Sequence, residues 1–158
     1  MNSQPETIPV VAMQTIVFEP TSAGSGSFWQ GDNLLATLTV LRRAGRQGRL
    51  SLRDTNQALD IVSHTRQHHT SYKMIEDLEQ IAVAERDVGE PSAALRYRGQ
   101  EYLATRESLL RIQDYQPKVA LALASNWNVK QMELRVDGEA DLPLVAFFLF
   151  IAFDLAMP

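Results

Sequence analysis

The sequence contains no cysteine, which excludes disulfides, thiolate chemistry and cysteine-based metal sites. It also lacks a basic excess, because 15 Lys and Arg stand against 19 Asp and Glu, for a formal net charge of -4. General nucleic-acid binders are basic as a rule, so we expect no nucleic-acid partner. The N-terminal stretch has no basic segment of the kind that opens a signal peptide. We therefore expect a cytoplasmic protein, either free or peripheral at a membrane.

Motifs for catalysis and cofactor binding are absent as well. The chain has no nucleophile elbow and no HExxH-type motif. His64 and His68 are four residues apart, a spacing that faces one side only on a helix, and no acidic residue close in sequence completes a metal site. The sequence therefore predicts that the protein is not an enzyme and holds no metal or cofactor.

What the chain does contain suits one globular domain. Its 158 residues can bury a sizeable core, and 45% hydrophobic with 22% charged residues is an ordinary balance. Residues 1–7 are predicted to be a disordered N-terminus, followed by a single domain over residues 8–158. Residues 8–18 are rich in Val and Ile and predict a strand. The Gly- and Ser-dense stretch 20–33 predicts a flexible loop.

Short alternating segments fill the chain from Leu34 onward. Turn signals recur about every 8–12 residues, the spacing of an all-β sandwich or barrel. The segments read LLATLTVL, LSLRD, ALDIVSHT, SYKMIED, EQIAVAER, ALRYRG, EYLATRE, SLLRIQDY, KVALALAS and QMELRVDG. A helical interpretation competes, because several of these segments contain good helix formers. Gly89, Pro91, Gly99 and Pro117 leave little room for long helices, so the pattern favours strands.

The last segment, DLPLVAFFLFIAFDLAMP, is different in kind. Asp141 can cap a helix, and Pro143 sits in the first turn, where its missing N–H costs least. A helix over residues 142–157 is apolar on all sides, as expected inside a protein or a membrane. Its length of ~24 Å is shorter than the ~30 Å hydrocarbon core of a bilayer. Asp154 would also be costly in lipid, so we expect a buried core helix.

A series of strands closing on one apolar C-terminal helix resembles the tubby C-terminal-like superfamily. The similarity is strongest to its LURP-one-related and phospholipid-scramblase branch. It rests on LSLRDTNQALDIV and YKMIEDLEQIAVAER, where a short strand precedes an Asp-centred turn, and on the final stretch from KVALALAS through IAFDLA. The resemblance implies a mainly β fold, a closed antiparallel barrel of about 12 strands around a central hydrophobic C-terminal α-helix.

The chain departs from the scramblases in two respects. It has no cysteine for acylation, and Ser125, Asn126 and Asn128 stand where carboxylates would help to hold calcium. Both departures count against lipid anchoring and calcium-triggered scrambling.

The most conspicuous charge cluster is an arginine-rich hairpin, with five of the fifteen basic residues within twelve positions. Its members are Arg42, Arg43, Arg46, Arg49 and Arg53. If they converge on one edge, their guanidinium groups match the geometry of a phosphate or lipid headgroup. The competing interpretation is a solvated charged hairpin that blunts a sheet edge. Phe28 and Trp29, in the predicted loop, are a second candidate contact, since they could bind a partner or fill the mouth of the barrel.

Three functions follow from these features. The first is a non-enzymatic binding module that recognises an anionic lipid headgroup or a phosphorylated ligand, by analogy with the phosphoinositide-binding tubby proteins. The second is a protein-interaction or regulatory scaffold with a protein partner. The third is a scramblase-like protein, which requires the last helix to enter a bilayer.

Overall fold

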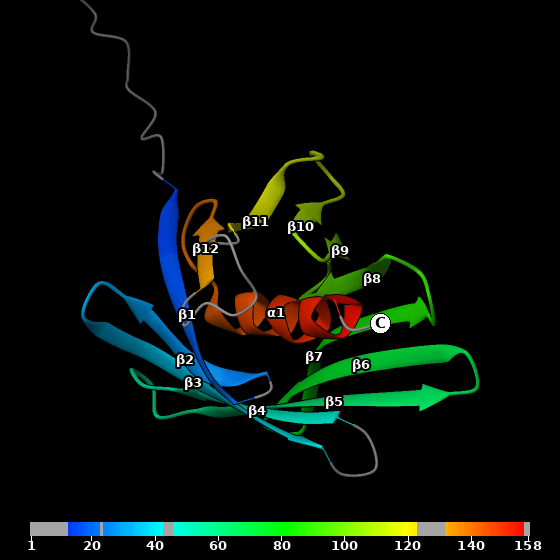
Figure 1. Ribbon diagram of the computed structural model, residues 1–158, viewed down its shortest axis with the longest axis horizontal. Coiled ribbons are helices and arrows are strands. Elements are labelled where there is room, and N and C mark those ends of the chain that lie inside the picture. The colour runs from blue at the N-terminus through cyan, green and yellow to red at the C-terminus, as the bar shows by residue number, and fades with distance from the viewer. Residues whose placement is uncertain (1–12, 23, 43–45, 123–131, 157–158) are drawn as a thin grey trace, which may run out of the picture.

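The computed structural model describes residues 13–22, 24–42, 46–122 and 132–156. These residues form a closed antiparallel barrel of twelve strands around one C-terminal helix, so the predicted fold class is confirmed (Figure 1). The predictions for residues 1–7 and for Ser125, Asn126 and Asn128 fall outside the described residues.

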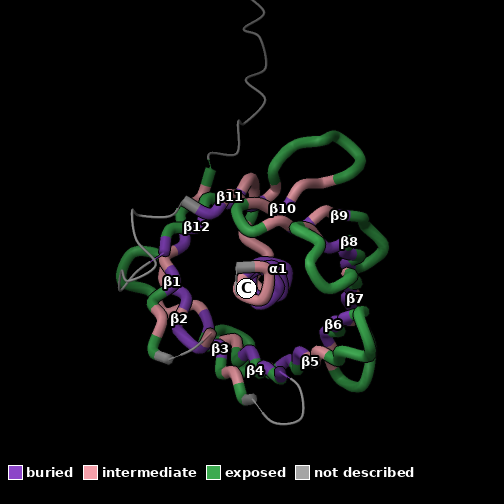
Figure 2. The backbone as a smooth tube through the Cα atoms, turned by 45° about the vertical axis from the view of Figure 1, so that its right-hand side comes forward, coloured by how far each residue is buried: buried purple, intermediate pink, exposed green. Residues whose placement is uncertain are grey.

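Each strand pairs with its neighbours in sequence, and β1 pairs with β12 to close the ring. The strands are β1 (Gln14–Ser22), β2 (Ser25–Gln30), β3 (Asn33–Arg42), β4 (Arg46–Leu52), β5 (Ala58–Arg66), β6 (His69–Glu76), β7 (Glu79–Asp87), β8 (Ser92–Tyr97), β9 (Gln100–Thr105), β10 (Ser108–Arg111), β11 (Pro117–Ala122) and β12 (Met132–Val136). Figure 2 shows the ring with the helix at its centre. Because the barrel is closed, the sheet has no unpaired edge strand.

The helix α1 (Leu142–Ala156) runs through the barrel, as the sequence predicted. Its residues from Leu144 to Ala152 are at most 4% exposed, which explains why apolar side chains cover all of its sides. Asp141 caps it, since its Oδ1 accepts from the Leu144 N–H at 3.4 Å. The described part of the chain contains no helix that is both long and apolar enough to span a membrane.

The strands supply the rest of the core by simple alternation. In β4, Gly48 and Leu50 are buried while Arg49 and Ser51 are exposed. Gly48 leaves room for the helix, because a Cβ at this position would lie only 3.1 Å from the Phe150 ring. Each fully buried Phe or Leu contributes about 1.5–3 kcal/mol to folding, so the side chains that the strands and the helix bury between them are a main source of stability.

The predicted loop over residues 20–33 was wrong, because β2 occupies residues 25–30. Phe28 is fully buried, and its ring centroid lies 4.9 Å from that of Phe18. The small residues here serve close packing: a Cβ at Gly26 would collide with the Glu19 carbonyl and lie 2.5 Å from the Phe18 ring. Composition alone does not distinguish a glycine needed for packing from one that makes a loop flexible.

Candidate functional site at the mouth of the barrel

A hollow of about 640 Å³ opens at the end of the barrel where α1 begins, and we call it the mouth hollow. Its walls come from β3, β4, β8, β9, β10 and β11 and from the turns beside them, with the start of α1 at its centre. It is lined by Leu35, Leu52, Asp54, Thr55, Tyr97, Arg98, Gln100, Tyr102, Arg111, Lys118 and the run 139–144. The hollow therefore joins residues that lie far apart in the sequence, from Leu35 to Leu144.

The base of the mouth hollow is apolar. Leu35 and Leu52 reach it from β3 and β4, and Leu142 and Leu144 reach it from the first turn of α1. All four pack in or against the hydrophobic core. A ligand here would meet an apolar surface below and polar side chains at the sides, a common composition for small-molecule sites.

Three cationic side chains line the hollow, from the β8–β9 turn, β10 and β11. Arg98 lies 2.8 Å from Glu76, and Arg111 lies 2.8 Å from Asp114, so both guanidinium groups are paired. Lys118 donates to the Asp137 carbonyl at 2.6 Å. No carboxylate among the described residues lies within 4.0 Å of the Lys118 ammonium group, which leaves it the least neutralised of the three.

Two tyrosines lie in this wall, and one of them, Tyr97, joins it to the residue that caps α1. The Tyr97 hydroxyl donates to Asp141 Oδ1 at 2.8 Å and accepts from Arg98 Nε at 3.0 Å. The Tyr102 hydroxyl donates to Gln100 at 3.0 Å. Burial raises the pKa of Tyr97 and of Tyr102 above the ordinary tyrosine range, so both hydroxyls stay neutral near pH 7. They can orient a ligand by hydrogen bonding but are poor general bases.

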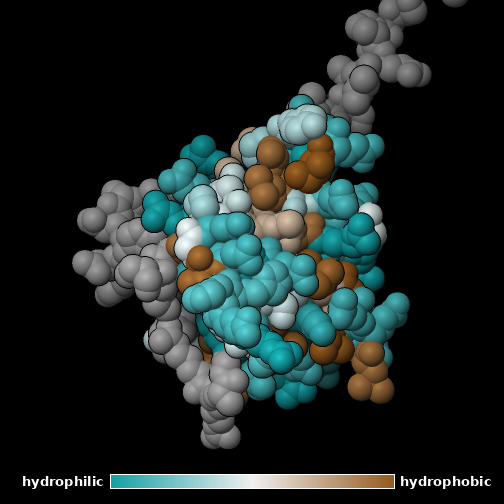
Figure 3. Space-filling model, turned by 90° about the vertical axis from the view of Figure 1, so that its right-hand side faces the viewer, coloured by the Kyte–Doolittle hydropathy of each residue, from teal (hydrophilic) through white to brown (hydrophobic). Residues whose placement is uncertain are grey.

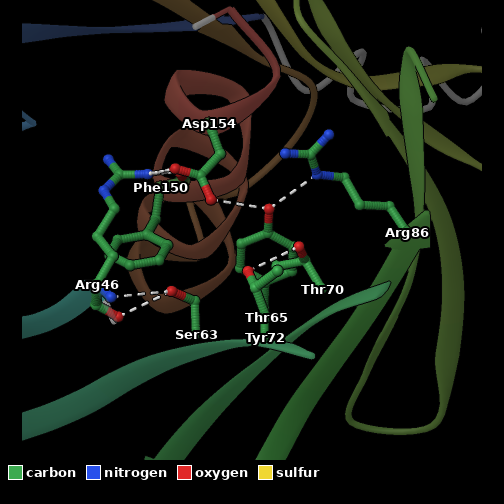
Figure 4. A network of polar contacts seen from close by, with 8 residues as sticks. All are labelled: Arg46, Ser63, Thr65, Thr70, Tyr72, Arg86, Phe150 and Asp154. Atoms are coloured by element: carbon green, nitrogen blue, oxygen red, sulfur yellow. Dashed lines mark hydrogen bonds and ion pairs between the residues drawn. The ribbon is translucent and has the colours of Figure 1, made fainter. Parts of the chain in front are cut away.

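The other end of the helix carries a second polar network, shown in Figure 4. Arg46 Nη1 donates to the Phe150 carbonyl at 2.8 Å and contacts the Asp154 carboxylate. The Tyr72 hydroxyl donates to Asp154 at 2.9 Å and accepts from Arg86 Nε at 3.0 Å. Both ends of α1 thus have an arginine, a tyrosine and an aspartate hydrogen-bonded in the same order. They are Arg98, Tyr97 and Asp141 at the start and Arg86, Tyr72 and Asp154 at the end, and each set holds the helix to the barrel wall.

The structure corrects the predicted arrangement of the arginine-rich hairpin. The Arg46 side chain points into the barrel, is only 9% exposed and lies over the Phe150 ring at 4.2 Å. Parity explains this inward direction, because Arg46 shares the inner face of β4 with Gly48 and Leu50. Arg46 therefore holds the helix and is not available to a ligand on the outer surface.

Arg49 and Arg53 do not lie beside Arg46 either. Arg49 points outward from the middle of β4, is 68% exposed and lies 3.7 Å from Asp60. Arg53 follows the far end of β4, ~23 Å from Arg46 at the rise of about 3.3 Å per strand residue. Arg42 ends β3 opposite Arg46, whereas Arg43 lies outside the described residues. Arg46, Arg49 and Arg53 therefore do not meet at one edge, as the hairpin prediction required.

The predicted aromatic contact of Phe28 and Trp29 lies on a strand and not in a loop. Phe28 belongs to the core, and Trp29 is half-buried on β2, so neither lies in an exposed loop. The Trp29 Nε1 is buried and has no hydrogen-bond partner among the described residues. Figure 3 faces the side where α1 ends and shows a mainly hydrophilic surface with hydrophobic residues in separate patches.

No motif in the sequence marks the mouth hollow. Tyr97, Tyr102, Arg111 and Lys118 lie on four different strands with no shared motif, and only the closure of the ring brings them together. Among the described residues, no group of three His, Asp or Glu side chains is placed to hold a metal ion.

Comparison with known proteins finds no match for this chain among family models, curated proteins or solved structures.

Proposed function

We propose that this protein is a non-enzymatic binding module of the tubby/LURP-one-related type, which holds an anionic group of its ligand in the mouth hollow. The observation that supports this most directly is a single hollow that combines an apolar base with Arg98, Arg111 and Lys118. An anionic lipid headgroup and a small phosphorylated molecule both present the chemistry that such a wall favours.

The packing of the barrel supports a site at its mouth. The helix fills the interior with side chains such as Phe147 and Phe148, both fully buried, so a ligand cannot lie deep between the strands. The sheet around the hollow is continuously hydrogen-bonded, which keeps its polar groups in fixed positions. A preorganised site loses little conformational entropy when a ligand binds.

Burial of α1 favours binding over scrambling. A scramblase-like mechanism requires this helix to contact lipid, yet its central residues are enclosed by strands on every side. Arg46 and Tyr97 further hold its two ends through Asp154 and Asp141. Release of α1 from the barrel would break the polar contacts at both of its ends and expose most of the core.

The test is an NMR titration with hexyl phosphate, accompanied by flotation with phosphatidylserine vesicles. We expect shifts confined to residues lining the mouth hollow, and about tenfold weaker binding in Lys118→Gln, which loses a charge-assisted hydrogen bond. Arg49→Gln is the matched control, because it also removes one positive charge, but from the outer face of β4. Equal loss in both variants, or shifts elsewhere on the barrel, would contradict the proposed site.

A protein-interaction scaffold is the second candidate, and two turn residues favour it. Leu78 is fully exposed at the β6–β7 turn, and Tyr115 is 76% exposed at the β10–β11 turn. Both have left-handed backbone conformations, with φ of 68° and 55°, which are strained for non-glycine residues. A partner that copurifies with the wild type but not with Leu78→Gly/Tyr115→Asn would support this function, and undiminished copurification would oppose it.

A further inference from the structure

The mouth hollow has charges of both signs. Its cations are Arg98, Arg111 and Lys118, and its carboxylates are Asp54, Glu139 and Asp141. Three positive and three negative side chains give a formal sum of zero. A ligand with a single charge therefore gains little from the net charge of the hollow, whereas a ligand with two opposite charges can gain from both sets.

Topology places two of these charges on opposite walls. Lys118 stands near the start of β11, and Asp54 follows the end of β4. In the closed ring, four strands separate β11 from β4 in one direction and six in the other. The first turn of α1 lies between the two walls, so the apolar base of the hollow separates the ammonium group from the carboxylate.

Lys118, Asp54, Glu139 and Asp141 are the charged groups of the hollow that form no ion pair with another described residue. Glu139 directly follows Gly138, which lies beside the Lys118 ammonium group, so Asp54 is the unpaired carboxylate on the opposite wall. No described cation lies within 4.0 Å of the Asp54 carboxylate, and no described carboxylate lies that close to Lys118. By contrast, Asp141 already accepts hydrogen bonds from Tyr97 and from the Leu144 N–H. A charged group at a partly enclosed site binds best where no existing ion pair has to be broken.

We propose that the ligand of the mouth hollow is a linear zwitterion, with a cationic and an anionic end separated by an apolar chain. Its anionic end lies at Lys118, its cationic end lies at Asp54, and the chain crosses the leucines at the base. This inference rests on the proposed function, because it assumes that the mouth hollow is the binding site. It narrows the ligand class, since a purely anionic group would leave the Asp54 carboxylate without a partner.

Four six-carbon probes test the charge arrangement at constant size. These are 6-aminohexanoate, hexanoate, hexylamine and norleucine, titrated into the full-length protein and followed by NMR. We expect 6-aminohexanoate to bind about fivefold more tightly than either singly charged probe, the size expected of one added partly exposed ion pair. Norleucine carries adjacent charges that cannot reach both walls, so it should bind no better than hexanoate.

Two variants test which side chain binds which end of the zwitterion. Asp54→Asn should reduce the affinity for 6-aminohexanoate to that for hexanoate, and Lys118→Gln should reduce it to that for hexylamine. Asp60→Asn is the control for a lost carboxylate, because Asp60 is 61% exposed on the outer face of β5. All three changes replace a charged group by a neutral amide of similar size.

The outcomes separate this inference from the proposed function. Equal affinity for hexanoate and 6-aminohexanoate at the mouth, or an unchanged preference in Asp54→Asn, overturns the zwitterion and leaves an anion-binding module. Absence of shifts at the mouth with all four probes and with hexyl phosphate overturns both.

Discussion

Replacement of Asp154 by alanine should destabilise the protein strongly, because it leaves a buried cation without its counter-charge. The Arg46 and Asp154 side chains are only 9% and 21% exposed. Asp154 also accepts from the Tyr72 hydroxyl. In Asp154→Ala the Arg46 guanidinium group would keep its hydrogen bond to the Phe150 carbonyl. The Arg46 Nε has no hydrogen-bond partner among the described residues even in the wild type.

The expected size follows from this burial. Removal of one partner of a buried ion pair costs about 3–5 kcal/mol, chiefly because the remaining charge stays desolvated. Asp154 retains some solvent contact, so we expect a loss of about 3 kcal/mol in the free energy of unfolding. Domains are stable by about 5–15 kcal/mol in total, so this single change removes a substantial fraction.

Urea denaturation followed by tryptophan fluorescence measures the effect. The double variant Arg46→Met/Asp154→Leu should recover most of the loss, since it removes both charges and fills the space with apolar atoms. Asp60→Ala is the surface control: its pair with Arg49 spans 3.7 Å with both side chains more than 60% exposed, and it should cost less than about 1 kcal/mol. A loss in Asp154→Ala no larger than in Asp60→Ala would refute the structural role of the Arg46 contact.

Three further predictions concern single groups. Burial is the main cause that raises the pKa of Tyr72 to about 12, so the neutral hydroxyl stabilises the fold below pH 10, and this contribution is lost as the pH rises from 10 to 12. Stability curves over that range should be less steep in Tyr72→Phe, and identical curves would contradict this. Leu78→Gly should raise the free energy of unfolding by about 1 kcal/mol, because glycine accepts the φ of 68° without strain; a lower denaturation midpoint would argue against it. The hydrogen bond that His69 Nδ1 donates to the Asp87 carboxylate at 3.0 Å raises the pKa of His69, so Asp87→Asn should lower the pKa of that imidazole in an NMR titration, and no change would exclude the contact in solution.

Local patterns predicted much of the barrel. The alternation in LLATLTVL and ALDIVSHT corresponds to β3 and β5, because one face of each strand meets the core and the other meets solvent. The pattern failed for β2, where glycine and serine allow Phe18 to pack closely against the strand. A residue that is small for packing reasons carries no hydrophobic signal, so no periodicity marks that strand.

The candidate site was far less predictable. Arg46 and Arg49 were predicted to form one cluster because they are close in sequence. They are three residues apart on β4, so their side chains lie on opposite faces of the sheet. The partner of Arg46 is Asp154, 108 residues away. Such a contact depends on the register of several strand pairs and on the rotation of the helix, and neither is encoded in a short window.

Local sequence was enough to predict a helix over residues 142–157 that lies inside the protein, because Asp141 can cap it and no side of it is polar enough for water, and the structure has this helix from Leu142 to Ala156. It also determined most of the strands, through their period of two. Three features became visible only in the folded barrel: which charged side chains face inward, how the helix is held at its two ends, and that Asp54 and Lys118 line the same hollow. The physical reason is that hydrophobic period is a local property, whereas the pairing of charges requires the ring to close and bring distant strands to one end of the barrel.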